Sequence, residues 1–260
     1  MFVILSGSSG VGKNTVIKEM QKTNENIVMM PTFTTREKRE GEIDGKPYFY
    51  ITKDDFQNKI KNEEFIEHEF IHNNYYGSSY IVFDEYINRG NILIKDIGVE
   101  GAQNLTLKLS DRTPIIKIFL TVHQKKELVK RLKGRGEKQI KLRLSRFGYE
   151  QKQMNKFDYI IYNSSLEETS DIVNNLTKLT DEDFLSDKDL TKLNPYKVKY
   201  YINKLNAGKI LSPIKIVVKN GKAYVLKGAE KLVASFVSNK PVAKVVVNKN
   251  IKTEKFVHNF

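Results

Sequence analysis

The sequence predicts an α/β fold, in which helices cover a parallel sheet and a small basic α+β segment follows. A glycine-rich loop at residues 7–13 lies between an apolar run and an amphipathic stretch, which is the order strand, turn, helix. Short apolar runs then alternate with amphipathic segments up to residue 179. Such alternation indicates a parallel sheet with helices on both faces. The net positive charge gathers after residue 190.

The first strand, loop and helix form a phosphate-binding pattern. MFVIL at residues 1–5 suits a buried strand, and NTVIKEMQK at residues 14–22 has the apolar spacing of a helix. The glycines let backbone N–H groups face inward, the helix N-terminus adds partial positive charge, and Lys13 reaches the outer phosphates. The ATP-binding candidates are Gly7, Ser8, Ser9, Gly10, Val11, Gly12, Lys13, Asn14 and Thr15.

Asn14 stands where the pattern G-x-x-x-x-G-K-[ST] has a hydroxyl for magnesium. Magnesium takes oxygen ligands, keeps several waters and is held mostly by substrate phosphates. The Asn14 carbonyl supplies an oxygen, and Thr15 keeps a hydroxyl beside it. We therefore expect a working loop with an altered affinity for magnesium.

The later elements continue the alternation, and ligands in such sheets bind at the carboxyl ends of the strands. Strands are predicted at NILIKDI (91–97), PIIKIFL (114–120) and DYIIYN (158–163), and helices at KKELVKRLKG (125–134), QIKLRLSRFGYEQKQM (139–154) and LEETSDIVNNLTKL (166–179).

Residues 32–50 contain candidates for a second phosphate site. Arg36 and Arg39 lie close together in this polar segment, and guanidinium groups bind phosphate oxygens bidentately. Further on, Glu67 precedes the run YYGS at residues 75–78, and a carboxylate pairs well with the adjacent N–H donors of guanine. Taken singly, each of these residues is equally well explained as a surface side chain.

Together the motifs resemble those of the guanylate kinase family over residues 1–178. The matching stretches, in family order, are GSSGVGK, TTREKREGEIDGKPYFY, EFIEHEFIHNNYYGSS, KDIGVEGAQ and RLKGRG. The resemblance implies a P-loop nucleoside monophosphate kinase core with a GMP-binding insert and a lid. It also implies transfer of the ATP γ-phosphoryl group to GMP, with magnesium.

The resemblance assigns roles to particular residues. It implies that Thr32 and Glu67 contact the guanine and that Asp96 lies near the metal, so Asn14 and Asp96 are the implied magnesium ligands. The residues implied at the GMP phosphate or closing its pocket are Arg36, Arg39, Tyr48, Tyr76 and Ser78. The implied catalytic cations are Lys13 and the lid residues Arg131, Arg135 and Arg143.

Two features depart from the family pattern. Gly98 stands where the family usually has an acid that helps to hold the purine, so we expect weaker discrimination among bases. The lid at residues 131–147 is a few residues shorter than usual.

The stretch HEFIH at residues 68–72 matches the zinc-protease pattern HExxH, which requires a helix. The surrounding residues alternate between apolar and polar, which predicts a strand. A strand would hold His68 and His72 roughly 13 Å apart, at about 3.3 Å per residue. We therefore expect no zinc site.

The composition limits the class of protein further. The chain has 260 residues and no Cys, which excludes disulfides and thiolate metal sites. It shows no apolar run of membrane-spanning length and no signal peptide. We therefore expect a cytoplasmic protein without a membrane partner.

The net charge of +13 is carried by residues 190–260, which contain fifteen Lys, no Arg and two acids. We expect domains at 1–180 and 196–260, joined by a linker at 181–195. The second reads helix, strand, Asn220-Gly221 turn, strand, helix, strand.

This order is similar to that of ParB/sulfiredoxin-like domains. Gly228 matches that fold, Lys231 stands where the fold has Arg, and Ala229 and Glu230 replace its characteristic residues. The lack of Cys excludes a sulfiredoxin reaction. Nucleotide or nucleic-acid binding and a plain Lys-rich surface both fit the composition.

The leading hypothesis is an ATP-dependent guanylate kinase with a basic accessory domain. Two alternatives stay open. One is an inactive guanylate-kinase-like scaffold that its C-terminal part recruits to a polyanion. The other is a kinase for a different purine monophosphate.

Overall fold

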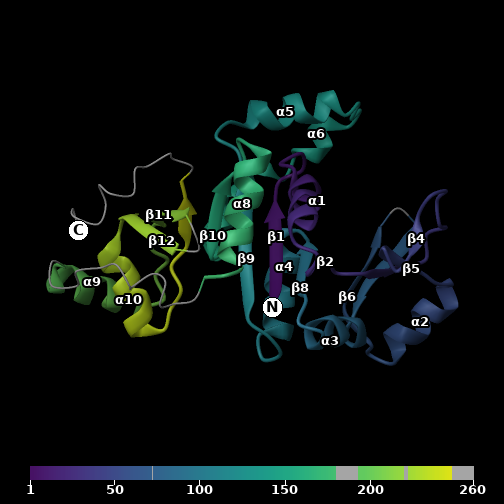
Figure 1. Cartoon of the computed structure of the whole chain (residues 1–260), viewed down its shortest axis with the longest axis horizontal. Coiled ribbons are helices and arrows are strands. Elements are labelled where there is room, and N and C mark those ends of the chain that lie inside the picture. The colour runs from purple at the N-terminus through teal and green to yellow at the C-terminus, as the bar shows by residue number, and fades with distance from the viewer. Residues whose placement is uncertain (72, 180–192, 220–221, 248–260) are drawn as a thin grey trace. The chain divides into compact units, whose positions relative to one another are not determined.

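The computed structural model describes residues 1–71, 73–179, 193–219 and 222–247 (Figure 1). The chain divides into two compact units. The first unit comprises Met1–Leu5 and Gln21–Ile116, and the second comprises Ser6–Met20 and the chain from Lys117 onward. No helix within the described residues is both long and apolar enough to cross a membrane.

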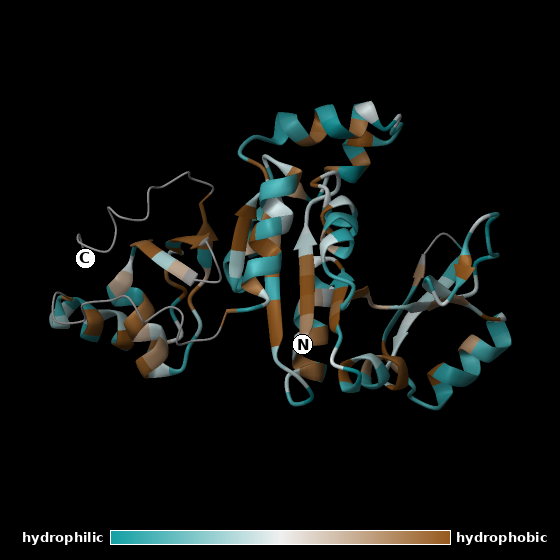
Figure 2. Ribbon diagram, viewed as in Figure 1, coloured by the Kyte–Doolittle hydropathy of each residue, from teal (hydrophilic) through white to brown (hydrophobic). Residues whose placement is uncertain are grey.

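Parallel strands form the core of the first unit. β1 pairs with β8, and β8 pairs with β2, so that Val3 lies opposite Ile94 and Val28 opposite Leu93. The apolar run that predicted β1 is completely buried from Phe2 to Leu5, and the strand is brown along most of its length in Figure 2. The elements are β1 (Phe2–Gly7), β2 (Ile27–Met29), α3 (Tyr80–Asn88), β8 (Ile92–Asp96) and α4 (Val99–Leu109).

A five-stranded sheet is inserted in this unit, in the order β4-β5-β3-β7-β6. Stacked aromatic rings hold it together, with the rings of Phe56 and Phe65 4.5 Å apart and those of Phe33 and Phe49 5.0 Å apart. Its elements are β3 (Thr32–Thr34), β4 (Ile43–Asp44), β5 (Pro47–Tyr50), α2 (Lys53–Lys61), β6 (Phe65–Ile71) and β7 (Asn74–Ser79).

The HExxH stretch begins in β6, so the strand prediction is confirmed for His68. His72 lies outside the described residues. A strand does not place two residues four apart in one metal shell, because the chain between them is extended.

The second unit contains the sheet order β12-β11-β13-β10-β9. β9 and β10 run parallel, with Phe119 opposite Ile160, and both residues are completely buried. The predicted strands and helices of this region are confirmed as α1 (Lys13–Thr23), β9 (Ile115–Thr121), α5 (Lys125–Gly134), β10 (Tyr159–Tyr162) and α8 (Leu166–Leu176).

The prediction of one continuous helix over residues 139–154 is wrong. The segment forms α6 (Ile140–Arg143), α7 (Phe147–Gln153) and the 3₁₀ turn η1 (Met154–Lys156). At the break, the Ser145 hydroxyl donates to the carbonyl oxygen of Leu142 at 2.7 Å. Ser side chains compete in this way with helical hydrogen bonds. Leu144 is buried at the same point.

The C-terminal elements follow the predicted order: α9 (Pro195–Asn206), β11 (Ile214–Lys219), β12 (Lys222–Lys227), α10 (Ala229–Ser238) and β13 (Lys244–Val246). α9 begins inside the predicted linker, because the Asn194 side chain accepts hydrogen bonds from the backbone N–H groups of Tyr196 and Lys197. The turn at Asn220-Gly221 lies outside the described residues.

β13 connects this segment to the strands before it. Val245 lies opposite Ile160 of β10 on one side and opposite Lys215 of β11 on the other, and both pairings are parallel. The C-terminal strands therefore add to the sheet of the second unit. The division into domains at 1–180 and 196–260 stays a prediction.

Because β13 pairs with both β10 and β11, a substitution in β11 should affect amide hydrogen exchange in β10. Ile216 of β11 is completely buried, and replacing a buried Ile by Ala costs about 2–5 kcal/mol. Since β13 joins β11 to β10, I216A is expected to speed amide hydrogen exchange in Tyr159–Tyr162 as well as in β11. Val237→Ala, at a position that is 66% exposed, is the matched control. Faster exchange confined to residues 193–247 would instead show that the segment folds on its own.

Candidate functional site

The phosphate loop lies in the second unit, between β1 and the start of α1. Gly7, Gly10 and Gly12 all have positive φ angles, which L side chains rarely adopt. A Cβ on Gly7 would lie 2.2 Å from the Leu120 carbonyl oxygen, so this position requires Gly. The Lys13 ammonium donates to the Gly7 carbonyl oxygen at 2.7 Å and so lies back across the loop.

Two side chains from far along the chain hold the loop. Arg131 of α5 donates to the carbonyl oxygens of Val11, at 3.0 Å, and of Asn163, at 2.6 Å. The buried Asn163 amide donates to the same Val11 carbonyl at 2.7 Å and accepts from the Thr169 hydroxyl. Arg131 thus contacts the loop backbone, which is a positioning contact beside its predicted catalytic role.

Asn163 was not among the predicted site residues. Its signal in the sequence is a polar residue directly after an apolar strand, at the carboxyl end where ligands bind in such sheets.

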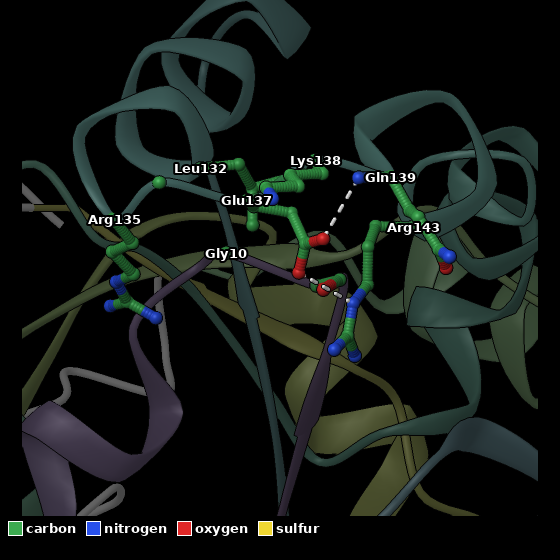
Figure 3. A pocket seen from close by; sticks show the side chains of 9 residues that line it. Gly10, Leu132, Arg135, Glu137, Lys138, Gln139 and Arg143 are labelled. Carbon is green, nitrogen blue, oxygen red and sulfur yellow. Dashed lines mark hydrogen bonds and ion pairs between the residues drawn. The ribbon is translucent and has the colours of Figure 1, made fainter.

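The lid segment encloses a pocket of about 490 Å³ together with Ser9 and Gly10 (Figure 3). Arg135 and Arg143 both line it. Glu137 accepts from the Gln139 backbone N–H at 2.9 Å and from Arg143 Nε at 3.1 Å. These two hydrogen bonds, the first being the stronger cause, lower the pKa of Glu137. Two predicted lid cations therefore lie beside the phosphate loop, one of them held by a carboxylate.

The implied magnesium ligands lie in different parts of the chain. Asn14 and Thr15 are exposed in the first turn of α1, and Asp96 ends β8. Among the residues that the structure describes, no group of three or more His, Asp or Glu side chains is arranged to hold a metal ion.

Arg36, in the first unit, already holds a carboxylate. Its Nη2 donates to both oxygens of Glu42, at 2.8 and 3.0 Å. Glu42 also accepts from the Arg39 backbone N–H and from the Tyr50 hydroxyl, each at 2.8 Å. The bond from Arg36, followed by that from Arg39, lowers the pKa of Glu42 to about 2. Glu42, an acid inside the predicted phosphate segment, was not singled out in the sequence.

Aromatic rings surround the Arg36 guanidinium. Its central carbon lies 5.5 Å from the ring centres of both Tyr48 and Tyr50, and Tyr76 packs against Tyr48 at 6.1 Å. Burial, followed by the neighbouring Tyr76, raises the pKa of Tyr48. The predicted residues Arg36, Tyr48 and Tyr76 therefore lie together.

A lysine that the sequence did not single out contacts Thr32 and Glu67, which were expected at the guanine, and Ser78, which was expected to close the phosphate pocket. Lys95 Nζ donates to the Thr32 hydroxyl at 2.8 Å and to the Ser78 hydroxyl at 2.7 Å. It lies 3.5 Å from a Glu67 carboxylate oxygen, which also accepts from Ser78 at 2.6 Å. In the sequence, Lys95 looks like the polar end of an apolar strand, so it was not predicted as a site residue. Only the folded chain brings it to these partners.

Gly98 begins α4 without a side-chain cap. A Cβ built on Gly98 would lie 4.0 Å from a carboxylate oxygen of Glu100. The Glu100 carboxylate therefore occupies the neighbourhood of the side chain that Gly98 lacks.

A sequence model described as "Guanylate kinase" matches residues 1–179. The chain belongs to the guanylate kinase family. A guanylate kinase of Prochlorococcus marinus subsp. pastoris is 39% identical over 170 residues, which is 64% of this chain and 91% of that protein. A guanylate kinase of Thermotoga maritima is 34% identical, over 65% of this chain and 82% of that protein.

The fold agrees with the family. The crystal structure of guanylate kinase from Anaplasma phagocytophilum matches with a TM-score of 0.52 and 26% identity, over 68% of this chain and 84% of that one. The guanylate kinase match ends at residue 179, so the described residues 193–247 follow it.

The Glu42 contacts lead to a prediction about pH. NMR titration of the Glu42 carboxyl is expected to give a midpoint of about 2, against an ordinary value of 4.5. Because the folded pKa is lowered, the stabilisation that this carboxylate contributes is complete above pH 4.5 and is lost as the pH falls toward 2. The difference in unfolding free energy between the natural chain and Glu42→Gln should shrink over that window.

Arg36→Gln is the matched control for this titration, because it removes the principal cause and should bring the midpoint back toward 4.5. A midpoint near 4.5 in the natural chain would contradict the prediction.

Proposed function

We propose that this chain transfers the γ-phosphoryl group of ATP to GMP or dGMP, giving ADP and GDP or dGDP. Membership of the guanylate kinase family supports the reaction. The observation that carries the proposal is the intact phosphate loop, with its glycine backbone, its helix N-terminus and Lys13 lying across it. A scaffold without catalysis has no need for this arrangement.

On this proposal, Lys13 and the lid residues Arg135 and Arg143 stabilise the charge that develops on the transferred phosphoryl group. Arg131 shares this task and also holds the loop at Val11. Phosphoryl transfer needs little covalent chemistry from the protein, so positioning and charge do most of the work.

The acceptor is held by the residues of the first unit. Arg36 and Arg39 bind the GMP phosphate, with Tyr48 and Tyr76 beside them. The contact of the Arg36 guanidinium with the Glu42 carboxylate supports this, because arginine pairs with carboxylates and with phosphates through the same charged donors. Thr32 and Glu67 contact the base, together with Ser78, whose hydroxyl accepts from Lys95 and donates to Glu67.

In the second unit, Asn14 and Thr15 offer the kind of oxygen donor that suits magnesium, because the ion prefers oxygen ligands and retains waters. When bound with ATP, it neutralises charge on the phosphates.

Lys13 provides the test of the reaction. Lys13→Ala is expected to lower kcat about 10³-fold or more, because it removes a cation from the transferred group. Lys18→Ala, at an exposed position of the same helix, should change it little. A coupled ADP assay across the nucleoside monophosphates, with ATP and magnesium, measures both.

The outcomes of this assay separate the alternatives. No transfer by the natural chain to any monophosphate would favour the scaffold, and turnover of AMP equal to that of GMP would favour another purine substrate. Asn14→Ser should shift the magnesium dependence without being needed for activity.

For the C-terminal segment we propose unspecific binding of nucleic acid. Residues 190–260 carry the whole net charge of the chain, and dense positive charge attracts phosphate-rich partners. On α9, Tyr196 is 84% exposed and Tyr200 52% exposed, and Lys204 Nζ lies 4.5 Å from the Tyr200 ring. Lys231 is engaged within the fold, since it donates to the Ser212 carbonyl oxygen and hydroxyl.

A pair of α9 variants tests this binding. The double substitution of Lys197→Gln with Lys199→Gln is expected to weaken binding of single-stranded DNA. It should also reduce the dependence of log K on log salt by about one for each phosphate that the variant no longer neutralises. Lys18→Gln with Lys61→Gln lowers the net charge equally at exposed sites elsewhere. Equal effects of the two doubles, or no binding by the natural chain at about 50 mM salt, would count against the proposal.

A further inference from the structure

Lys95 is the last residue but one of β8, and its side chain is only 11% exposed. An ammonium group taken out of water is costly unless it is paired and hydrogen-bonded. Here its partners come from three strands of the inserted sheet, Thr32 of β3, Ser78 of β7 and Glu67 of β6. The lysine therefore lies at the centre of the group that the proposed function assigns to the base.

The hydrogen bonds in this group run in one direction. Lys95 donates to the Ser78 hydroxyl, and that hydroxyl donates to Glu67. A protonated Lys has donors and no acceptor, and an ionised Glu has acceptors and no donor. The group consequently presents a donor end at Lys95 beside an acceptor end at Glu67.

Purine bases differ in how they match this polarity. Guanine carries acceptors at O6 and N7, while adenine carries a donor at its 6-amino group next to N7. Lys contacts to O6 and N7 are among the commonest means by which proteins select guanine. A donor at Lys95 therefore suits a 6-oxopurine and opposes a 6-aminopurine.

We propose that Lys95 is a specificity-determining residue that donates a hydrogen bond to the O6 atom of a 6-oxopurine monophosphate. The inference rests on the proposed function, because it takes Thr32, Glu67 and Ser78 as the base site. Glu67 accepts from N1–H, which guanine and hypoxanthine share. Since Gly98 supplies no acid for the 2-amino group, selection against adenine falls to Glu67 at N1–H and to Lys95 at O6.

A merely structural role for Lys95 is the competing explanation. In that case the ammonium only neutralises Glu67 and holds the three strands, and its loss would affect every nucleotide alike. A direct contact to O6 predicts instead that replacing this oxygen lowers the binding affinity only when Lys95 is present.

Calorimetric binding of GMP, IMP, AMP and 6-thio-GMP to the full chain distinguishes the two. Sulfur is a weaker acceptor than oxygen, so the natural chain should bind GMP more tightly than 6-thio-GMP. Lys95→Met is expected to weaken GMP and IMP roughly 10- to 100-fold, as for loss of a hydrogen bond to a charged group. It should not weaken the binding of AMP, and it should remove the preference for GMP over 6-thio-GMP.

Two further variants complete the experiment. Lys61→Met, at an exposed position of α2 in the same unit, should bind as the natural chain does. Lys95→Arg keeps a cationic donor and should retain most of the preference for oxygen over sulfur. If Lys95→Met does not fold, the affinities of the natural chain and of Lys95→Arg for GMP and 6-thio-GMP still test the proposal.

Equal weakening of all four nucleotides by Lys95→Met would overturn the assignment, as would a natural chain that binds GMP and 6-thio-GMP equally. Binding is measured separately from turnover. A natural chain that shows the expected preferences but transfers no phosphoryl group would therefore refute the proposed reaction and leave the role of Lys95 standing.

Discussion

The carbonyl oxygen of Val11 is the point at which the phosphate loop is fixed. It accepts hydrogen bonds from Arg131 and from Asn163, which lie on α5 and just after β10. A glycine-rich loop has many accessible backbone conformations, and restricting them costs conformational entropy. The two bonds supply an external restraint, so the inward-facing N–H groups are arranged before any phosphate arrives. Packing of β9 against Gly7 restrains the start of the same loop.

In the first unit, ion pairs hold the two groups of proposed GMP-binding residues. Arg36 is paired with Glu42, and Lys95 is paired with Glu67. A partly buried charge is costly unless it is paired. The carboxylates supply this pairing and orient both cations, and a bound nucleotide has to share or replace them.

Local sequence patterns sufficed for β1, the phosphate loop and α1, because the apolar run, the glycines and the helical spacing are all contiguous. The prediction of a single helix over residues 139–154 was wrong because hydrophobic spacing does not reveal that the Ser145 hydroxyl donates to the Leu142 carbonyl oxygen. Asn163, Glu42 and Lys95 were missed for another reason. Each acts through partners brought together by tertiary structure, and Lys95 meets Thr32 across 63 positions of sequence. Arg36, Tyr48 and Tyr76 lie together, whereas Ser78 lies with Thr32 and Glu67 around Lys95 instead of with the residues predicted at the phosphate.

The parallel pairing of β13 with β10 has a consequence for the order of events during synthesis. β10 ends at Tyr162 and β13 begins at Lys244, so one edge of β10 stays unpaired while about 80 further residues are synthesised. At about 5–20 residues per second, that interval lasts roughly 4–16 s. Throughout it, the nascent chain carries an open strand edge, the kind of surface on which chains pair wrongly with one another. The C-terminal segment thus covers a strand edge that the preceding residues leave open.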